Sequence, residues 1–195
     1  MTIDDVQSLS RLLQRMQNED PQFQVFGSTH HRYRFGPPLS ESELLEFERL
    51  HHITLPADYR FFLRNAGDGG AIRSSAPYVA INSGPGPGCG VLPLEEAVEE
   101  CNPGRPFPLV KSVEVQPFPG IERWGDDEAY PGVLQLSYVG SAGYDFLVVN
   151  GLAYGTMWGA DVDIRNFAPV APSFEAWYYD WMKRLTDMVP SKESD

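Results

Sequence analysis

Cysteine is scarce in this chain of 195 residues, which contains only Cys89 and Cys101. Two cysteines cannot build a disulfide framework, and without a Cys-x-x-Cys pair there is no reason to expect a zinc site. We therefore expect two free thiols in a reducing compartment. The amino-terminal residues Met-Thr-Ile-Asp-Asp also lack the basic and apolar stretches of a secretory leader. These features predict a cytoplasmic protein.

Long apolar runs and positive charge are both in short supply. No stretch approaches the roughly 18 consecutive apolar residues of a membrane-spanning helix. Only 15 Lys and Arg stand against 27 Asp and Glu, which gives a formal net charge of −12. A protein this acidic is repelled by nucleic acids and anionic membranes and is attracted to basic proteins. We expect a basic protein partner, and neither nucleic acid nor membrane; high solubility is the alternative explanation of the same charge.

Catalytic motifs are missing as well. Gly-x-Ser-x-Gly does not occur, and the glycine-rich segment 83–90 alternates with prolines, which lack the N–H groups that cradle a phosphate. The histidines form two adjacent pairs, at 30–31 and 51–52. Adjacent side chains point in different directions, so neither pair clamps one metal ion by itself. The sequence therefore predicts no enzyme activity, no cofactor and no metal site.

Acidic residues in the second half of the chain leave one catalytic alternative open. Asp161 and Asp163 are spaced like residues on one face of a strand. They could bind magnesium if they met the acidic residues Asp126, Asp127 and Glu128. No phosphate-handling motif accompanies them, so a solvated charged loop is the simpler interpretation. A metal-dependent enzyme stays the less favoured alternative.

Residues 39–70 carry the most informative pattern that is present. Ser40 and Glu43 have the spacing of a capping box, which opens a helix. Pro56 suits the first position of a second helix, because its missing N–H would be unpaired there anyway. Apolar residues recur at helical spacing on both sides of Pro56, and glycines 67, 69 and 70 end the second helix. The stretch predicts two short amphipathic helices joined by a rigid elbow.

Further helices and strands are predicted outside this stretch. Helical spacing of apolar residues covers 2–17 and 173–188, and residues 190–195 form a frayed tail. Asn150-Gly151 favours a type I′ turn that closes a hairpin. Strand patterns cover 133–139, 144–149 and 154–158, with weaker ones in 71–81 and 107–115.

Several short motifs resemble the SUKH superfamily. Within 39–70 these are Ser-Glu-x-Glu-Leu-x-x-Phe-Glu, Ile-x-Leu-Pro-x-Asp-Tyr-x-x-Phe-Leu and Asn-x-Gly-x-Gly-Gly; later come Gly-Tyr-Asp-Phe-Leu-Val-Val-Asn-Gly and Gly-Thr-Met-Trp. That superfamily includes the fungal cell-wall synthesis regulator, the bacterial SecY-interacting protein and many toxin-immunity proteins. The resemblance implies an α+β fold: a twisted, mainly antiparallel sheet with helices packed on one side. Residues 1–195 would form one such domain.

The same resemblance implies a protein-binding domain without catalysis. SUKH immunity proteins bind a cognate toxin and block its active site; a regulatory scaffold of the cell-wall-regulator type is the alternative. Acidic side chains would face a basic groove on the toxin. Trp124, in a proline- and acid-rich loop, could be an exposed anchor, with burial in the core as its alternative. The candidate partner-binding residues are Asp68, Glu122, Trp124, Asp126, Asp127, Glu128, Asp161 and Asp163.

Overall fold

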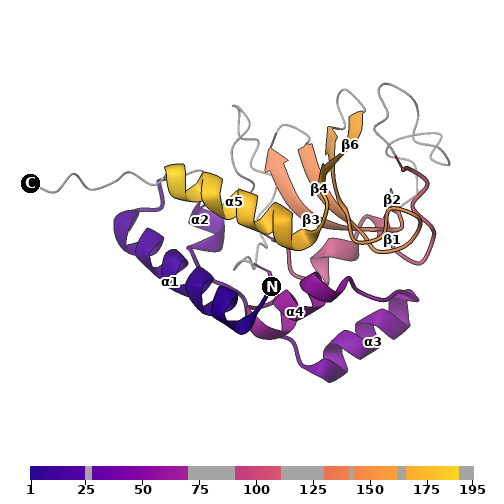
Figure 1. The fold of residues 1–195 in the computed structure, drawn as a ribbon, viewed down its shortest axis with the longest axis horizontal. Helices are drawn as coiled ribbons and strands as arrows, with labels where there is room; N and C mark the ends of the chain where they lie inside the picture. Colours follow the sequence, from indigo (N-terminus) through magenta and orange to yellow (C-terminus); the bar gives the residue numbers. More distant parts are fainter. Residues whose placement is uncertain (25–27, 70–90, 111–129, 141–142, 162–165, 189–195) are drawn as a thin grey trace, which may run out of the picture.

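The computed structural model combines helices with a small antiparallel sheet (Figure 1). It describes residues 1–24, 28–69, 91–110, 130–140, 143–161 and 166–188. The helices are α1 (Ile3–Glu19), α2 (Ser28–His31), α3 (Glu41–His51), α4 (Ala57–Asn65) and α5 (Phe174–Met188), with a 3₁₀ turn η1 (Glu96–Val98). In the described ranges, no helix is long and apolar enough to cross a membrane.

The strands form two sheets. β1 (Cys101–Asn102) pairs in parallel with β2 (Tyr130–Pro131). The larger sheet is antiparallel in the order β3 (Val133–Gly140), β4 (Gly143–Val148), β5 (Met157–Asp161) and β6 (Asn166–Ala171). The three predicted strands are therefore present as β3, β4 and β5, although β5 begins at Met157 instead of residue 154.

Capping boxes open two of the helices. At α1, the Thr2 hydroxyl accepts a hydrogen bond from Asp5 N at 3.3 Å, and the Asp5 carboxylate accepts one from Thr2 N at 2.6 Å. Ser40 and Glu43 form the same arrangement at α3. These bonds pair N–H groups that have no partner inside the helix. The predicted elbow is confirmed, except that Pro56 is the N-cap of α4 rather than its first helical residue.

Both faces of the larger sheet are buried. The face toward the helices holds Leu134, Leu136, Leu147 and Met157, in one core with side chains of α1, α3, α4 and α5. The opposite face holds Val133, Phe146, Val148 and Trp158, and the 107–109 segment covers it. Because successive strand residues point to opposite faces, nearly continuous apolar runs such as 146–149 supply both cores.

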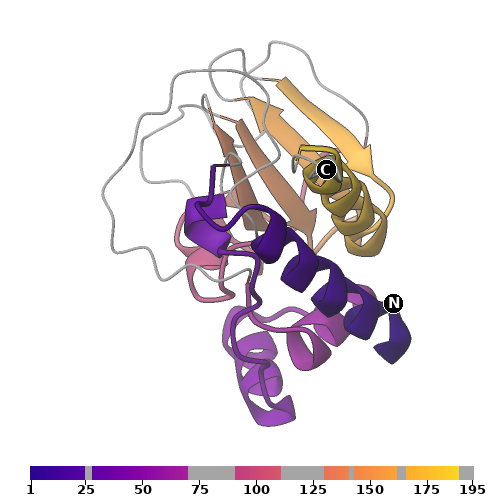
Figure 2. The same cartoon turned by 90° about the vertical axis from the view of Figure 1, so that its left-hand side faces the viewer.

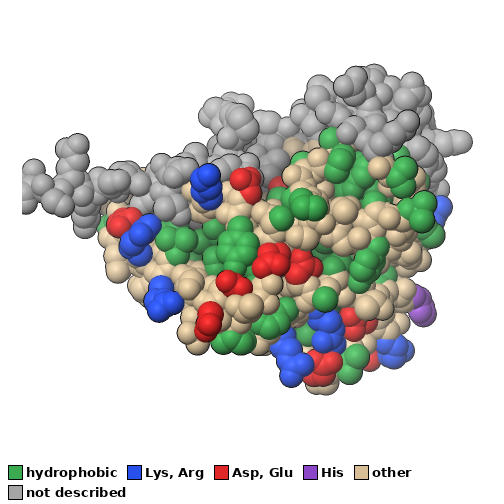
Figure 3. Space-filling model, in the orientation of Figure 1, with side chains coloured by type: hydrophobic (Ala, Val, Ile, Leu, Met, Phe, Trp, Pro, Cys, Tyr) green, Lys and Arg blue, Asp and Glu red, His purple; other side chains and the backbone are tan. Residues whose placement is uncertain are grey.

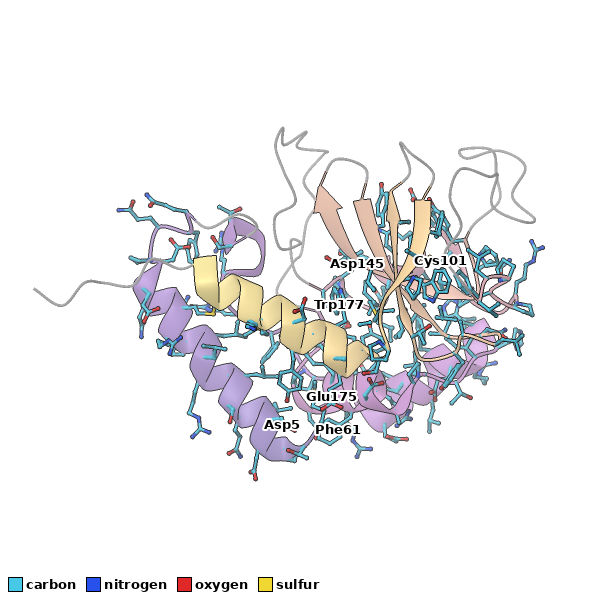
Figure 4. The ribbon with its side chains drawn as sticks, turned by 45° about the horizontal axis from the view of Figure 1, so that its top comes forward. Asp5, Phe61, Cys101, Asp145, Glu175 and Trp177 are labelled. Carbon is cyan, nitrogen blue, oxygen red and sulfur yellow. The ribbon has the colours of Figure 1, made fainter. Side chains whose placement is uncertain are left out.

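Helix α5 joins the helical layer to the sheet. Phe174 lies 4.8 Å from Tyr59 and 5.0 Å from Phe62, measured between ring centroids. Trp177 points from α5 toward Asp145 on β4, and its indole N–H donates to the carboxylate at 3.2 Å (Figure 4). The helices gather on one side of the sheet (Figures 1 and 2). The predicted α+β fold is confirmed.

The loop between β4 and β5 differs from the predicted two-residue hairpin. Gly151 has a φ of 107°, but Asn150 does not adopt a positive φ, which a type I′ turn requires. Gly155 N instead donates to Val148 O at 2.8 Å and closes a longer loop. The hairpin itself is present, since β4 and β5 pair antiparallel. The predicted type I′ turn was wrong, because Asn150 O accepts a bond from Phe107 N at 3.0 Å, a contact with a distant segment.

Strand β6 was not predicted. Its sequence contains Pro169, which has no N–H to donate and argues against a central strand. β6 lies at the edge of the sheet, where a strand tolerates this loss. The predicted strand at 71–81 lies outside the described residues, and residues 107–110 form no regular strand.

Candidate partner-binding groove

A groove of about 510 Å³ lies between α3 and the segment 94–98, and we call it the α3 groove. Its apolar lining residues are Leu39, Phe47, Leu50, Leu94 and Val98. Its polar lining residues are Ser42, Glu43, Glu46, His51, Asp68 and Glu95. In both ribbon views the 91–102 segment, drawn in pink, lies between α3 and the sheet (Figures 1 and 2).

Asp68 holds the two walls of the groove together. Its backbone N–H donates to Pro37 O at 3.0 Å, beside the start of α3. Its side-chain Oδ1 accepts from Leu94 N at 2.8 Å, on the opposite wall. Leu92 N donates to Leu136 O at 2.7 Å and so attaches that wall to β3. The groove is therefore built on the sheet and on the loop that follows α4.

A glycine allows this loop to pass close to the second wall. Gly69 has a φ of 74°, in the left-handed region that glycine enters at little cost. A Cβ atom at this position would come within 2.9 Å of Val91 O. Any larger residue at position 69 would push the loop away from the second wall, so the glycine shapes the groove.

The floor of the groove is apolar and partly open to solvent. The rings of Phe47 and His51, one helical turn apart on α3, are 4.4 Å apart between centroids. Leu50, between them in sequence, also lines the groove and is 61% exposed. Leu45 is 53% exposed on the same helix but does not line the groove. Leu50 is thus an apolar side chain available to a partner.

Carboxylates surround this floor. Glu43 and Glu46 stand on α3, and Glu95 and Asp68 stand at the other wall. Glu43 also serves the capping box, and Glu46 pairs with Arg49 at 2.7 Å. None of the described lining residues is Lys or Arg. The groove therefore presents a net negative rim.

Like charges lie close together at this end of the molecule. Burial raises the pKa of Asp68, and the nearby Glu95 and Glu43 raise it further. Burial also raises the pKa of Glu96, with additional contributions from Glu99, Asp68 and Glu95. Each such carboxylate is harder to ionise first because it is partly buried and then because its neighbours are negative. A cation bound here would relieve that repulsion.

Elsewhere on α3 and α4, acidic and basic side chains neutralise one another. Arg60 bonds both carboxylate oxygens of Glu41, at 2.7 and 3.1 Å, and Arg64 also contacts Glu41. Arg60 Nε lies 3.4 Å from Glu48. Figure 3 shows blue and red side chains next to each other along this lower edge of the molecule. The α3 groove differs from this surface because carboxylates are in excess among its lining residues.

Of the predicted partner-binding residues, the structure places one in the groove. Asp68 lines it, although the residue is half-buried and also holds the walls together. Asp161 ends β5, where its backbone pairs with Gly143 and Asn166. The remaining candidates lie outside the described residues; they are Glu122, Trp124, Asp126, Asp127, Glu128 and Asp163.

Sequence reasoning missed most of the groove. The sequence patterns place Glu43, Glu46 and Leu50 on a helix without a further role, and no pattern singles out Glu95. Their spacing on α3 does carry a signal, because residues three or four apart share one side of a helix. The opposite wall could not be found this way, since it comes from a segment far along the chain.

Groups capable of metal binding or nucleophilic chemistry do not converge in the described part of the chain. No cluster of three His, Cys, Asp or Glu residues there could hold a metal ion. Burial raises the pKa of the Cys101 thiol to about 12. That side chain stays protonated near neutral pH and is a poor nucleophile. His52 ends α3 in the left-handed conformation, with a φ of 54°.

Comparison with known proteins gives one match. The family described as SMI1 / KNR4 family (SUKH-1) matches residues 38–180. This range runs from the start of α3 into α5 and includes both walls of the groove, whereas α1 and α2 precede it. No curated protein and no solved structure matches the chain significantly.

Proposed function

The chain belongs to the SMI1/KNR4 family (SUKH-1). From that premise we propose that it is a protein-binding domain without catalysis. Its function would be that of an immunity protein, which binds and neutralises a cognate bacterial toxin. The observation that carries the proposal is the α3 groove, whose apolar floor lies inside a rim of carboxylates. Such a surface is complementary to a basic protein with an exposed apolar side chain.

Binding would act by steric and electrostatic block. The net charge of −12 attracts a basic partner from a distance and speeds encounter. After contact, Leu50 and Phe47 would bury apolar surface, while Glu43, Glu46 and Glu95 face the cations of the partner. The toxin's active site is then covered by the bound domain. No bond is made or broken in this mechanism.

The test is protection of living cells. The protein is expressed together with the product of the neighbouring gene, and growth is compared with and without it. We expect the neighbour to be toxic alone, to be tolerated in the presence of this chain, and to co-purify with it at low salt. A harmless neighbour, or toxicity that persists with both proteins expressed, contradicts the immunity role.

The exposed apolar floor favours a second candidate, a regulatory scaffold that binds several partners. Apolar contacts need no strong charge complementarity and survive high salt, whereas attraction between exposed charges is screened. Partners that stay bound in pull-downs at 0.5 M salt, a concentration at which the Debye length is only about 4 Å, would favour the scaffold over the toxin inhibitor.

A further inference from the structure

We infer that the α3 groove binds an amphipathic α-helix of the partner, with one apolar stripe flanked on both sides by Lys or Arg. The inference rests on the proposed function for the existence of a protein partner, and it names the structural element that this partner inserts. Four features of the groove support it: its length, the nature of its walls, the placement of its charges and its exposed leucine.

The length of the groove fits a short helix. Its α3 wall runs from Ser42 to His51, which spans about 14 Å at a rise of about 1.5 Å per residue. A partner helix of about nine residues, or two and a half turns, has the same length. Such a helix presents apolar side chains at i, i+3 or i+4, and i+7 on one face.

The walls favour a helix over an extended peptide. An added strand would need a row of unpaired backbone N–H and C=O groups at a sheet edge. The described lining residues belong instead to α3, the 3₁₀ turn η1 and neighbouring loops, and none lies on a strand. These elements offer side chains, into which the ridges of another helix can pack.

Carboxylates stand on both walls of the groove, which is why we infer Lys or Arg on both flanks of the partner helix. Glu43 and Glu46 lie along α3, and Glu95 stands on the opposite wall beside Asp68. A helix lying between the walls would bring one row of cations to each. The carboxyl-terminal end of α3, at His51 and His52, adds the partial negative charge of its last carbonyl groups.

Leu50 is the side chain that the apolar stripe of the partner helix would contact. It is 61% exposed, so a helix seated in the groove would cover it together with Phe47. Replacement of Leu50 does not disturb the core, because the side chain lies at the surface. Leu45, 53% exposed on the same helix but outside the groove, is a matched control.

The experiment uses the full chain and three fluorescent synthetic peptides of about 14 residues, long enough for three to four helical turns. The first carries a leucine stripe flanked by lysines. The second replaces the lysines by glutamates, and the third keeps the composition but scatters the leucines. Dissociation constants are measured by fluorescence anisotropy, and the bound region is located by protection of residues 39–51 and 91–98 from hydrogen exchange.

We expect the lysine-flanked stripe to bind most tightly and to protect both walls. Leu50→Lys should weaken binding about tenfold, as for the loss of a central anchor, and Leu45→Lys less than about twofold. Glu95→Lys should weaken it more than Asp4→Lys, an equal change of charge on α1. Thermal unfolding of each variant confirms that it remains folded.

Equal losses for Leu50→Lys and Leu45→Lys overturn the inference, as does equal binding of all three peptides or protection elsewhere on the chain. None of these results bears on whether the chain protects cells from a toxin. Conversely, selective peptide binding without cellular protection would overturn the immunity role and still support a helix-binding groove.

Discussion

The backbone N–H of Glu175 donates a hydrogen bond to Asp58 Oδ2 at 2.9 Å, across 117 residues of chain. Asp58 Oδ1 accepts a second bond, from Tyr59 N at 2.9 Å. One carboxylate at the start of α4 thus pairs an N–H in the first turn of α5, where the helix dipole also favours negative charge. The Asp-Tyr step of the SUKH motif therefore has a structural role, which is to dock the last helix.

Replacement of Asp58 should loosen that docking. Asp58→Ala removes both acceptors, and we expect a loss of about 1.5–3 kcal/mol in the free energy of unfolding, the range for bonds to a charged partner. Asp58→Asn keeps one side-chain oxygen and should lose less. Urea unfolding measures both, with the exposed Glu99→Ala as control. A loss no larger than that of the control would mean that the bond is dispensable.

Arg60 should matter more for stability than Arg49, although both pair with glutamates. Arg60 is 23% exposed and bridges α3 and α4 through Glu41 and Glu48, whereas Arg49 is 70% exposed and pairs within α3. Lysine cannot form the two parallel bonds that arginine makes to one carboxylate.

We therefore expect Arg60→Lys to lower the free energy of unfolding by about 1 kcal/mol, and Arg49→Lys to leave it nearly unchanged, as for an exposed pair. Urea unfolding at low and high salt is the measurement. If the two variants are equally stable, the bridge between the helices contributes nothing beyond an ordinary surface pair.

Two glycines with similar backbone angles should differ in their tolerance of alanine. Gly132 has a φ of 69° and Gly155 a φ of 83°, so an alanine at either position would pay the cost of a left-handed residue, about 1–2 kcal/mol. A Cβ at Gly132 would also come within 2.3 Å of Phe107 N, while one at Gly155 meets nothing within 4 Å.

Gly132→Ala should consequently lower the melting temperature clearly more than Gly155→Ala. The reason is that the 107–109 segment must move away from the sheet face that it covers, the face opposite the helices. Near-ultraviolet circular dichroism should show the change, since Phe107 packs against Trp158 at 5.0 Å between ring centroids. Equal melting temperatures would indicate that this segment adapts without loss.

Binding of the lysine-flanked peptide should weaken as the pH falls from about 7 to about 5, the range in which histidine titrates. Burial and the neighbouring His52 lower the pKa of His51, so it becomes positive at a lower pH than an ordinary histidine. The pKa of Asp68 is raised, so this carboxylate loses its charge at a higher pH than an exposed one. Both changes reduce attraction for cations.

The other charged groups around the groove are Glu43, Glu46 with its partner Arg49, Glu95, Glu96 and Glu99. Anisotropy titrations with the lysine-flanked peptide at several pH values test the direction. His51→Asn and Asp68→Asn should each flatten the profile; Asn at position 68 keeps the oxygen that Leu94 N requires. Affinity that rises on acidification would contradict the assigned charge of the groove.

Local patterns were sufficient for four of the helices, α1, α3, α4 and α5, and for three of the strands, whereas the short helix α2 was not predicted. The capping boxes at Thr2 and Ser40 depend on residues three apart, and the strands β3, β4 and β5 on runs of apolar residues. Prediction failed where a distant contact competes with local preference. Asn150 bonds to Phe107 instead of forming a type I′ turn, and Pro169 conceals β6 because an edge position is visible only in the assembled sheet.

The amino-acid sequence alone therefore determined where α3 begins, the excess of acidic residues in the chain and the kinship of the chain with the SUKH superfamily. These properties depend on composition and on neighbours along the chain. Only the tertiary structure decided that Glu43, Leu50 and Glu95 share one groove. That groove depends on the bond from Leu94 N to Asp68, which spans 26 residues, and on a wall attached to β3. Contacts between such distant segments arise from packing of the whole core, and no local pattern encodes them.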